Sequence, residues 1–166
     1  FLQTLWSPAG GWNADSSNII KQIVRDFALS RRLTKERPIF DDLRSFIVTE
    51  IAPMIHSDEG YRCGDVNVTL SRFDIDGLVL AMGDYSTGGP FGFLLNDRNP
   101  RDLFSSRFTV FEVDKLSGIN DSRFYSLCIL CIMNSFNAKM RNTPGMKVMV
   151  IEEAWKAIAN ETMSGY

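Results

Sequence analysis

Apolar residues recur at helical spacing through the first part of the chain. A predicted helix over residues 16–33 has one apolar face, formed by Ile19, Ile20, Ile23, Val24 and Phe27. A second predicted helix begins just after Pro38, and Pro53 should end or kink it because proline has no N–H to donate. A third is predicted over about 74–82. We therefore expect residues 1–105 to form a mainly helical subdomain.

The pattern changes after about residue 105. Residues 108–113 form a short, mostly apolar run that predicts a strand covered on both faces, and residues 147–151 form a second one. Between them, residues 121–141 predict a buried helix that Pro144 and Gly145 close. A helical start follows the second strand. Strand, helix, strand and helix in this order predict parallel strands joined by a right-handed crossover, so residues 106–166 are expected to be part of an α/β domain.

Composition narrows the class of protein only slightly. The chain has 166 residues, 45% of them hydrophobic and 23% charged, which is typical of a globular domain. A net charge of −2 gives no overall attraction to nucleic acid or to an anionic membrane. No apolar run is long enough for a transmembrane segment. The chain begins without a methionine, and we expect it to be part of a longer protein.

Two groups of residues have an ordinary structural interpretation and a functional alternative. Cations gather after the first predicted helix, where they suit the helix dipole or could contact DNA phosphates: Arg31, Arg32, Lys35 and Arg37. The cysteines have no disulfide spacing pattern and are expected to be reduced thiols, although with His56 they could supply four zinc ligands: Cys63, Cys128 and Cys131. Because Cys128 and Cys131 lie in an apolar helical run, the thiol interpretation is favoured.

Two adjacent acids, Glu152 and Glu153, directly follow the second predicted strand. In an open parallel sheet, functional groups gather at the carboxyl ends of the strands. A P-loop NTPase needs one carboxylate there to hold Mg²⁺, and often a second to orient the attacking water. The apolar strand and its two acids thus match the Walker B pattern. The alternative is that both acids only suit the dipole of a helix that begins there.

The longer string Val148-Met-Val-Ile-Glu-Glu-Ala-Trp-Lys-Ala-Ile158 resembles the Walker B region of type IV secretion conjugation ATPases, particularly the TraG-type ATPases of conjugative transposons. Upstream, Phe108–Leu116 looks like the strand that precedes the crossover helix in that family. Three further pieces resemble its helical insertion between Walker A and Walker B: Phe1–Trp6, Ile39–Phe46 and Gly88–Asn96. The resemblance implies a partial RecA-like P-loop core with an N-terminal helical insertion.

The resemblance also implies roles for individual residues. Glu152 takes the Mg²⁺-associated position, reaching the ion through water, and Glu153 takes the position of the catalytic glutamate. The family usually has Asp at the first position, so direct coordination by the longer Glu152 side chain is in doubt. Trp155 is expected to pack at the start of its helix. Gly-x-x-x-x-Gly-Lys-Ser/Thr is absent from the sequence, and we expect this Walker A loop to lie before Phe1. This chain alone should therefore not hydrolyse ATP.

For the intact protein the resemblance implies ATP and Mg²⁺ as cofactors, and ATP hydrolysis that drives DNA or protein transfer or channel assembly. It further implies a homo-hexamer, other type IV secretion components as partners, and a cytoplasmic location at the periphery of the inner membrane. Three alternatives remain open: a DNA-pumping coupling protein of the same superfamily, a non-catalytic helical interaction module, and a nucleic-acid-binding domain, which the net charge does not support.

Overall fold

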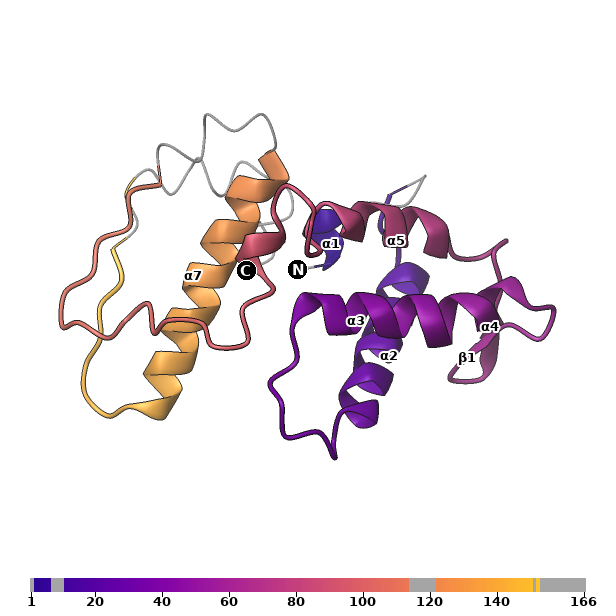
Figure 1. Cartoon of the computed structure of the whole chain (residues 1–166), viewed down its shortest axis with the longest axis horizontal. Helices are drawn as coiled ribbons and strands as arrows, with labels where there is room; N and C mark the ends of the chain where they lie inside the picture. The colour runs from indigo at the N-terminus through magenta and orange to yellow at the C-terminus, as the bar shows by residue number, and fades with distance from the viewer. Residues whose placement is uncertain (1, 7–10, 114–121, 151, 153–166) are drawn as a thin grey trace. The chain divides into compact units, whose positions relative to one another are not determined.

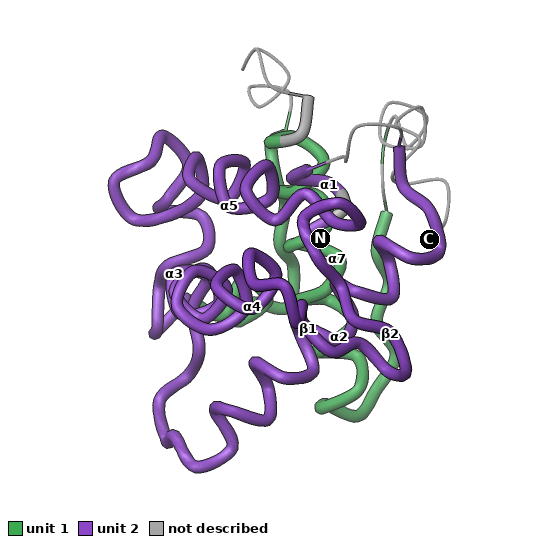
Figure 2. Tube along the Cα trace, turned by 90° about the vertical axis from the view of Figure 1, so that its right-hand side faces the viewer, with its two compact units in different colours: residues 1, 101–166 green, residues 2–100 purple. Residues whose placement is uncertain are grey.

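The computed structural model describes residues 2–6, 11–113, 122–150 and 152. Figure 2 colours the two compact units into which the chain divides. The N-terminal unit spans Leu2–Pro100, and the C-terminal unit begins at Arg101. The assignment of residues 1–105 to a helical insertion and of 106–166 to an NTPase core stays a proposal.

Helices make up most of the N-terminal unit (Figure 1). They are α1 (Leu2–Leu5), α2 (Ala14–Ser30), α3 (Phe40–Phe46), α4 (Ala52–His56), α5 (Ile75–Gly83) and the short 3-10 helix η2 (Gly92–Leu94). The helices predicted over 16–33 and 74–82 are confirmed as α2 and α5. The Asn13 side chain caps α2 by accepting a hydrogen bond from the Ser16 N–H at 2.8 Å.

A π-helical turn, η1 (Ile47–Ile51), joins α3 to α4 without a break. The hydrogen bond that defines this wider turn runs from the Ala52 N–H to the carbonyl of Ile47, five residues back, where an α-helix would span four. Pro53 follows directly, inside α4. Because Pro53 has no N–H, it cannot donate a helical hydrogen bond, and a regular α-helix would be interrupted here. The wider π-helical turn before it accommodates this missing bond. The helix therefore continues past Pro53 to His56 and does not end there.

A β-hairpin that the sequence pattern did not predict follows this helix. Strands β1 (Tyr61–Cys63) and β2 (Val66–Val68) pair antiparallel, with Tyr61 opposite Val68. Gly64 has a φ of +62°, which glycine adopts without strain, so it can begin the two-residue turn. The turn signal Gly64-Asp65 is present in the sequence, but three-residue strands are too short to give a clear alternation.

The core of the N-terminal unit draws on every long helix. Its largest fully buried side chains are Leu5, Ile23, Ile47, Ile55, Val68, Ile75, Leu78, Met82 and Tyr85. Trp6 completes one end, with its ring edge-on to those of Trp12 and Phe73 at centroid distances of 5.6 and 5.5 Å. This core therefore packs α2, η1, α4 and α5 together with the hairpin.

The C-terminal unit is built on one long helix, α7 (Ser122–Asn142), which confirms the helix predicted over 121–141. The strands predicted over 108–113 and 147–151 are not formed in the described residues, where 108–113 and 147–150 have no regular secondary structure. Phe108 is 84% exposed and Val148 73% exposed. A strand needs a neighbour for its ladder hydrogen bonds, and no such neighbour lies among the described residues. In the described part of the chain, no parallel sheet of the predicted α/β core is present, and the one sheet is the antiparallel hairpin.

Within the described residues, no helix combines the length and the apolar character that crossing a membrane requires.

Candidate functional site

The predicted Walker B segment is only partly described. Residues 147–150 have no regular secondary structure and no ladder partners among the described residues, and Glu152 lies exposed in a turn. Glu153 and Trp155 lie outside the described residues. Glu152 is thus accessible to a ligand, and its geometry toward Glu153 stays a prediction.

The end of α7 anchors the start of this segment. Gly145 turns the chain with a φ of +98°, and the Lys147 side chain folds back onto the helix end. Its Nζ donates to the carbonyl of Thr143 at 2.7 Å and also reaches those of Pro144 and Gly145, at 3.2 and 3.3 Å. A cation at a helix C-terminus satisfies unpaired carbonyls and suits the dipole. Lys147 therefore fixes where the segment leading to Glu152 leaves α7.

The first predicted strand segment is held against α7 by an ion pair and aromatic contacts. Lys139 Nζ lies 2.8 Å from Asp102 Oδ2, and Asp102 Oδ1 accepts the N–H of Phe104 at 2.9 Å. The Phe104 ring contacts Phe136 on α7 and Phe111 further along the segment, at centroid distances of 5.6 and 5.5 Å. The hydrogen bonds from Lys139 and from the Phe104 N–H lower the pKa of Asp102, and burial opposes them only weakly.

These contacts set the direction of residues 102–113 relative to α7. Asp102 meets Lys139, Phe104 meets Phe136, and Val113 packs on the cluster of Ile129 and Leu130. The contacts therefore move from the C-terminal part of α7 towards its N-terminal part as the segment advances. The segment is not one extended strand, because the rings of Phe104 and Phe111 are in contact at a centroid distance of 5.5 Å, whereas residues seven apart in a strand lie about 23 Å apart.

The thiols and the single histidine form no metal site in the described part of the chain. No group of three or more His, Cys, Asp or Glu side chains there could hold a metal ion. Burial and then the neighbouring Cys131 raise the pKa of Cys128 to about 11, and burial also raises the pKa of Cys131. His56 instead lies 3.2 Å from Asp76, at the exposed junction of α4 and α5.

A second polar cluster joins two segments that the sequence analysis singled out separately, Ile39–Phe46 and Gly88–Asn96. The Phe40 N–H donates to the Leu95 carbonyl at 3.3 Å. The Asp41 N–H donates to Asn96 Oδ1 at 2.9 Å, and the Asn96 side-chain amide donates in turn to the Gly92 carbonyl at 2.9 Å. These bonds lock the start of α3 to the loop that follows α5.

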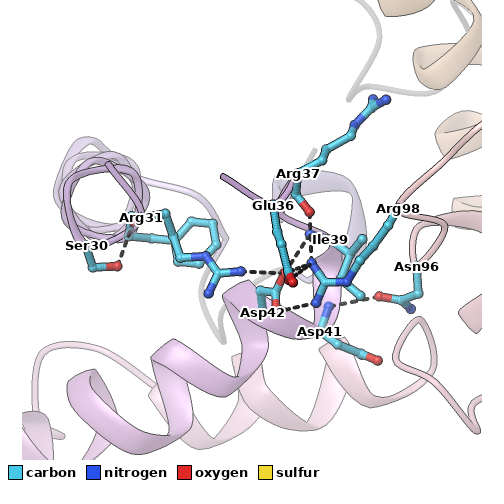
Figure 3. Close-up of polar contacts among 10 residues, drawn as sticks. Ser30, Arg31, Glu36, Arg37, Ile39, Asp41, Asp42, Asn96 and Arg98 are labelled. Atoms are coloured by element: carbon cyan, nitrogen blue, oxygen red, sulfur yellow. Dashed lines mark hydrogen bonds and ion pairs between the residues drawn. The ribbon is translucent and has the colours of Figure 1, made fainter. Parts of the chain in front are cut away.

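Asp42 is the centre of this cluster, as Figure 3 shows. Its carboxylate accepts the N–H of Ile39 at 3.0 Å, which caps α3, and it pairs with Arg31 at 3.0 Å. Arg98 binds both of its oxygens, and Arg98 Nη1 also donates to the Arg37 carbonyl at 2.9 Å. Burial raises the pKa of Asp42, but the hydrogen bonds from Ile39 and Arg98 and the charges of both arginines outweigh burial, so the pKa is lowered.

Glycines are required in the loop after α5 because backbones approach closely there. A Cβ on Gly89 would lie 2.4 Å from the carbonyl oxygen of Gly83, and one on Gly92 would lie 2.3 Å from that of Ser86. The chain folds back tightly, with the Phe91 N–H bonded to the Asp84 carbonyl at 2.9 Å. The Gly-Gly-Pro-Phe-Gly sequence therefore encodes one compact loop.

The basic residues after α2 separate into two groups. Arg31 is used in the ion pair with Asp42. Arg32, Lys35 and Arg37 are exposed, and their side chains make no ion pair with the described residues. Sequence reasoning did not find Arg98, because nothing in its local sequence indicates a partner 56 residues away.

Comparisons with known proteins assign this chain to a family. A family model described as the TraG P-loop domain matches residues 2–166, and so includes both units and the acidic pair. Neither curated proteins nor solved structures give a significant match.

Proposed function

Because the chain belongs to the TraG P-loop domain family, of conjugation-associated NTPases, we propose that it is the part of a conjugative-transfer ATPase from the helical insertion through Walker B. In the intact protein, ATP hydrolysis drives DNA or protein transfer, or assembly of the secretion channel. The observation that carries this proposal is the family match across both units, together with two acids that follow the apolar segment 147–151.

The two acids would have separate roles in ATP hydrolysis. Glu152 would hold Mg²⁺ through a bound water, and Glu153 would orient and deprotonate the water that attacks the γ-phosphate. An exposed carboxylate fits this donor chemistry, because Mg²⁺ in nucleotide sites takes one or two protein carboxylates beside phosphates and waters. The bound ion would neutralise charge that develops on the phosphates. The extra methylene of Glu152 relative to Asp favours the water-mediated mode.

The family match and the position of α7 between two apolar segments support a RecA-like core for the C-terminal unit. In a βαβ unit a helix joins two parallel strands, and Lys147 starts the second segment at the C-terminal end of α7. In the intact protein we propose that residues 108–113 and 147–151 become parallel strands when their sheet neighbours are present. Glu152 and Glu153 then stand at the carboxyl edge of that sheet.

The phosphate-binding loop has to come from outside this sequence, which contains no Gly-x-x-x-x-Gly-Lys-Ser/Thr. We propose that the 166-residue chain by itself does not hydrolyse ATP. The intact protein is proposed to be a homo-hexamer at the periphery of the inner membrane, with other type IV secretion components as partners.

The role of Glu152 is tested by its Mg²⁺ dependence in the intact protein. Glu152→Gln should raise the Mg²⁺ concentration that gives half-maximal ATP hydrolysis by about tenfold or more, because one ligand charge is lost. Glu50→Gln, an exposed acid in η1 of the N-terminal unit, is the matched control and should leave this concentration unchanged. An unchanged Mg²⁺ dependence in the Glu152 variant would remove this residue from the site.

The main competing function is a non-catalytic helical interaction module, in which both acids only begin a helix. The observation in its favour is that the described residues are mostly helical and form no parallel sheet whose carboxyl edge the acids could occupy. Under that alternative, neither Glu152→Gln nor Glu153→Gln changes any activity of the intact protein. A DNA-pumping coupling protein would show the same dependence on both acids as a secretion ATPase and would differ in moving DNA.

A further inference from the structure

The two segments that flank α7 are both tied to the C-terminal end of this helix. Lys139 Nζ pairs with Asp102 Oδ2 at 2.8 Å, where the first segment begins. Lys147 Nζ donates to the Thr143 carbonyl at 2.7 Å, where the second segment begins. The Thr143 N–H donates in turn to the Lys139 carbonyl at 3.1 Å, so the helical spacing continues from one tie to the other. The two ties therefore lie about one helical turn apart.

Lys147 has several partners at this helix end. Its ammonium carries three N–H groups, and besides Thr143 it reaches the carbonyls of Pro144 and Gly145 at 3.2 and 3.3 Å. The last carbonyls of a helix have no N–H partner within the helix, and a cation beside them also suits the helix dipole. The Lys147 side chain is partly buried in this position. A cation on a long side chain is therefore what fits here.

Burial alternates along the chain from this lysine onward. Lys147 and Met149 are partly buried, whereas Val148 and Val150 are 73% and 79% exposed, and Glu152 is exposed. Successive side chains of an extended chain point to opposite faces, so odd and even positions separate. With Lys147 tied to the end of α7, Glu152 falls among the exposed positions.

A change of register at Lys147 would move Glu152. The acid follows five residues later, about 17 Å away in a strand that rises about 3.3 Å per residue. A slip by one residue turns every side chain of a strand to the other face, so it would turn Glu152 towards the partly buried side. Among the described residues no ladder partner fixes this register, which leaves the tie at Lys147.

We propose that Lys147 is a positioning residue for Glu152: its tie to the end of α7 sets the register of residues 147–151 and so turns the acid towards the Mg²⁺ site. This inference rests on the proposed function, in which residues 147–151 form a strand and Glu152 holds the ion through water. Lys147 does not touch the ion, because it stands at the opposite end of that strand. Its effect on hydrolysis passes through the position of Glu152.

Lys147→Met in the intact protein tests this role, because methionine keeps much of the side chain and loses the cation. The Mg²⁺ concentration for half-maximal ATP hydrolysis should rise by about three- to tenfold, since groups that orient an ion-binding residue contribute strongly to ion affinity. At saturating Mg²⁺, the KM for ATP should change by less than about twofold. Lys147→Arg keeps a cation on a long side chain and should keep the Mg²⁺ dependence close to wild type. Arg141→Met, on an exposed cation in the last turn of α7, is the matched control and should leave that dependence unchanged.

A double variant separates positioning from a general loss of stability. Lys147→Met combined with Glu152→Gln should need no more Mg²⁺ than Glu152→Gln alone, because both changes act through one carboxylate. Effects that add, or a Mg²⁺ dependence of Lys147→Met equal to that of Arg141→Met, overturn the proposal. If Lys147→Met loses helical content by circular dichroism, Lys147→Gln, with a shorter neutral side chain, is measured in its place with the same expectation.

The same measurements separate this inference from the proposed function. If Glu152→Gln leaves the Mg²⁺ dependence unchanged, the role of Glu152 is wrong and the positioning role of Lys147 is wrong with it. If Glu152→Gln raises the required Mg²⁺ concentration and Lys147→Met does not, only the role of Lys147 is wrong.

Discussion

Arg98 donates to both carboxylate oxygens of Asp42, from Nη1 to Oδ2 at 3.0 Å and from Nη2 to Oδ1 at 3.1 Å, although 56 positions separate them in the chain. Only 17% of the Asp42 side chain is exposed. Arg98 precedes Pro100, the last residue of the N-terminal unit. This pair therefore holds the exit of the helical unit against the first turn of α3, where Asp42 also caps the helix.

Asp42→Asn should destabilise the N-terminal unit by about 1–3 kcal/mol, because it removes charge-assisted hydrogen bonds and leaves two arginines without their shared anion. Urea unfolding followed by circular dichroism measures the loss. Asp97→Asn, on an exposed carboxylate of the neighbouring loop, is the matched control and should change the free energy of unfolding by less than about 0.5 kcal/mol. Equal effects of the two variants would contradict the role given to Asp42.

The same carboxylate predicts a pH dependence. Because the folded pKa of Asp42 is lowered, the unfolded chain takes up the proton first as the pH falls. The stabilisation by Asp42 is complete above about pH 4, near the unfolded pKa, and is lost as the pH falls through the folded pKa. The difference in unfolding free energy between the wild-type chain and Asp42→Asn should thus be largest at pH 6 and shrink towards pH 3. Asp102 shifts in the same direction but is present in both proteins, so it cancels. A difference that stays constant over this range would be the contrary result.

Gly89→Ala and Gly92→Ala should each destabilise the loop after α5 by about 1–3 kcal/mol, because a methyl group would collide with the backbone carbonyls of Gly83 and Ser86. Gly83→Ala is the matched control. A Cβ at Gly83 meets nothing within 4 Å, and the residue lies in α5, so alanine there should be neutral or stabilise by up to about 1 kcal/mol. Thermal unfolding of the three variants measures the effects. Midpoints for Gly89→Ala and Gly92→Ala equal to that of Gly83→Ala would contradict the close backbone approach.

Phe104→Ala should loosen the C-terminal unit and leave the N-terminal unit intact. Its ring connects Phe111 to Phe136 on α7, so its loss should cost about 1–3 kcal/mol of local stability. Hydrogen exchange measured by mass spectrometry should speed up in α7 and stay unchanged in α2 and α5. Leu33→Ala, which removes a 98% exposed side chain in the loop after α2, should change exchange in neither region. Unchanged exchange in α7 after the Phe104 substitution would argue against the packing of residues 102–113 on this helix.

The sequence predicted the long helices because their apolar positions repeat over several turns. Residues 121–141 are the best case, since α7 begins and ends within a residue of the predicted bounds. The hairpin around Gly64 was missed because its strands have three residues each. The continuation of the helix through Pro53 was missed because a π-turn leaves no local signature. The pairing of Asp42 with Arg98 depends on the packed tertiary structure, which local patterns do not encode.

The candidate acidic pair was identified from the sequence, and the structure describes only one of its two residues, Glu152. The family resemblance rested on Glu152, Glu153 and Trp155, and the family match over residues 2–166 confirms it. The predicted strands around the site depended on propensity alone. Val148 and Val150 are 73% and 79% exposed, because strand propensity does not form a sheet without hydrogen-bonding neighbours. The roles of the two acids stay predictions.

The central claim is tested most directly by ATP hydrolysis in the intact protein with Glu153→Gln. If Glu153 activates the attacking water, kcat should fall by about 10²–10⁴-fold while ATP binding is retained. Glu50→Gln, an exposed glutamate in η1, is the matched control and should keep wild-type turnover. Turnover by Glu153→Gln equal to that of the control would contradict the assignment of Glu153 and favour the non-catalytic interaction module.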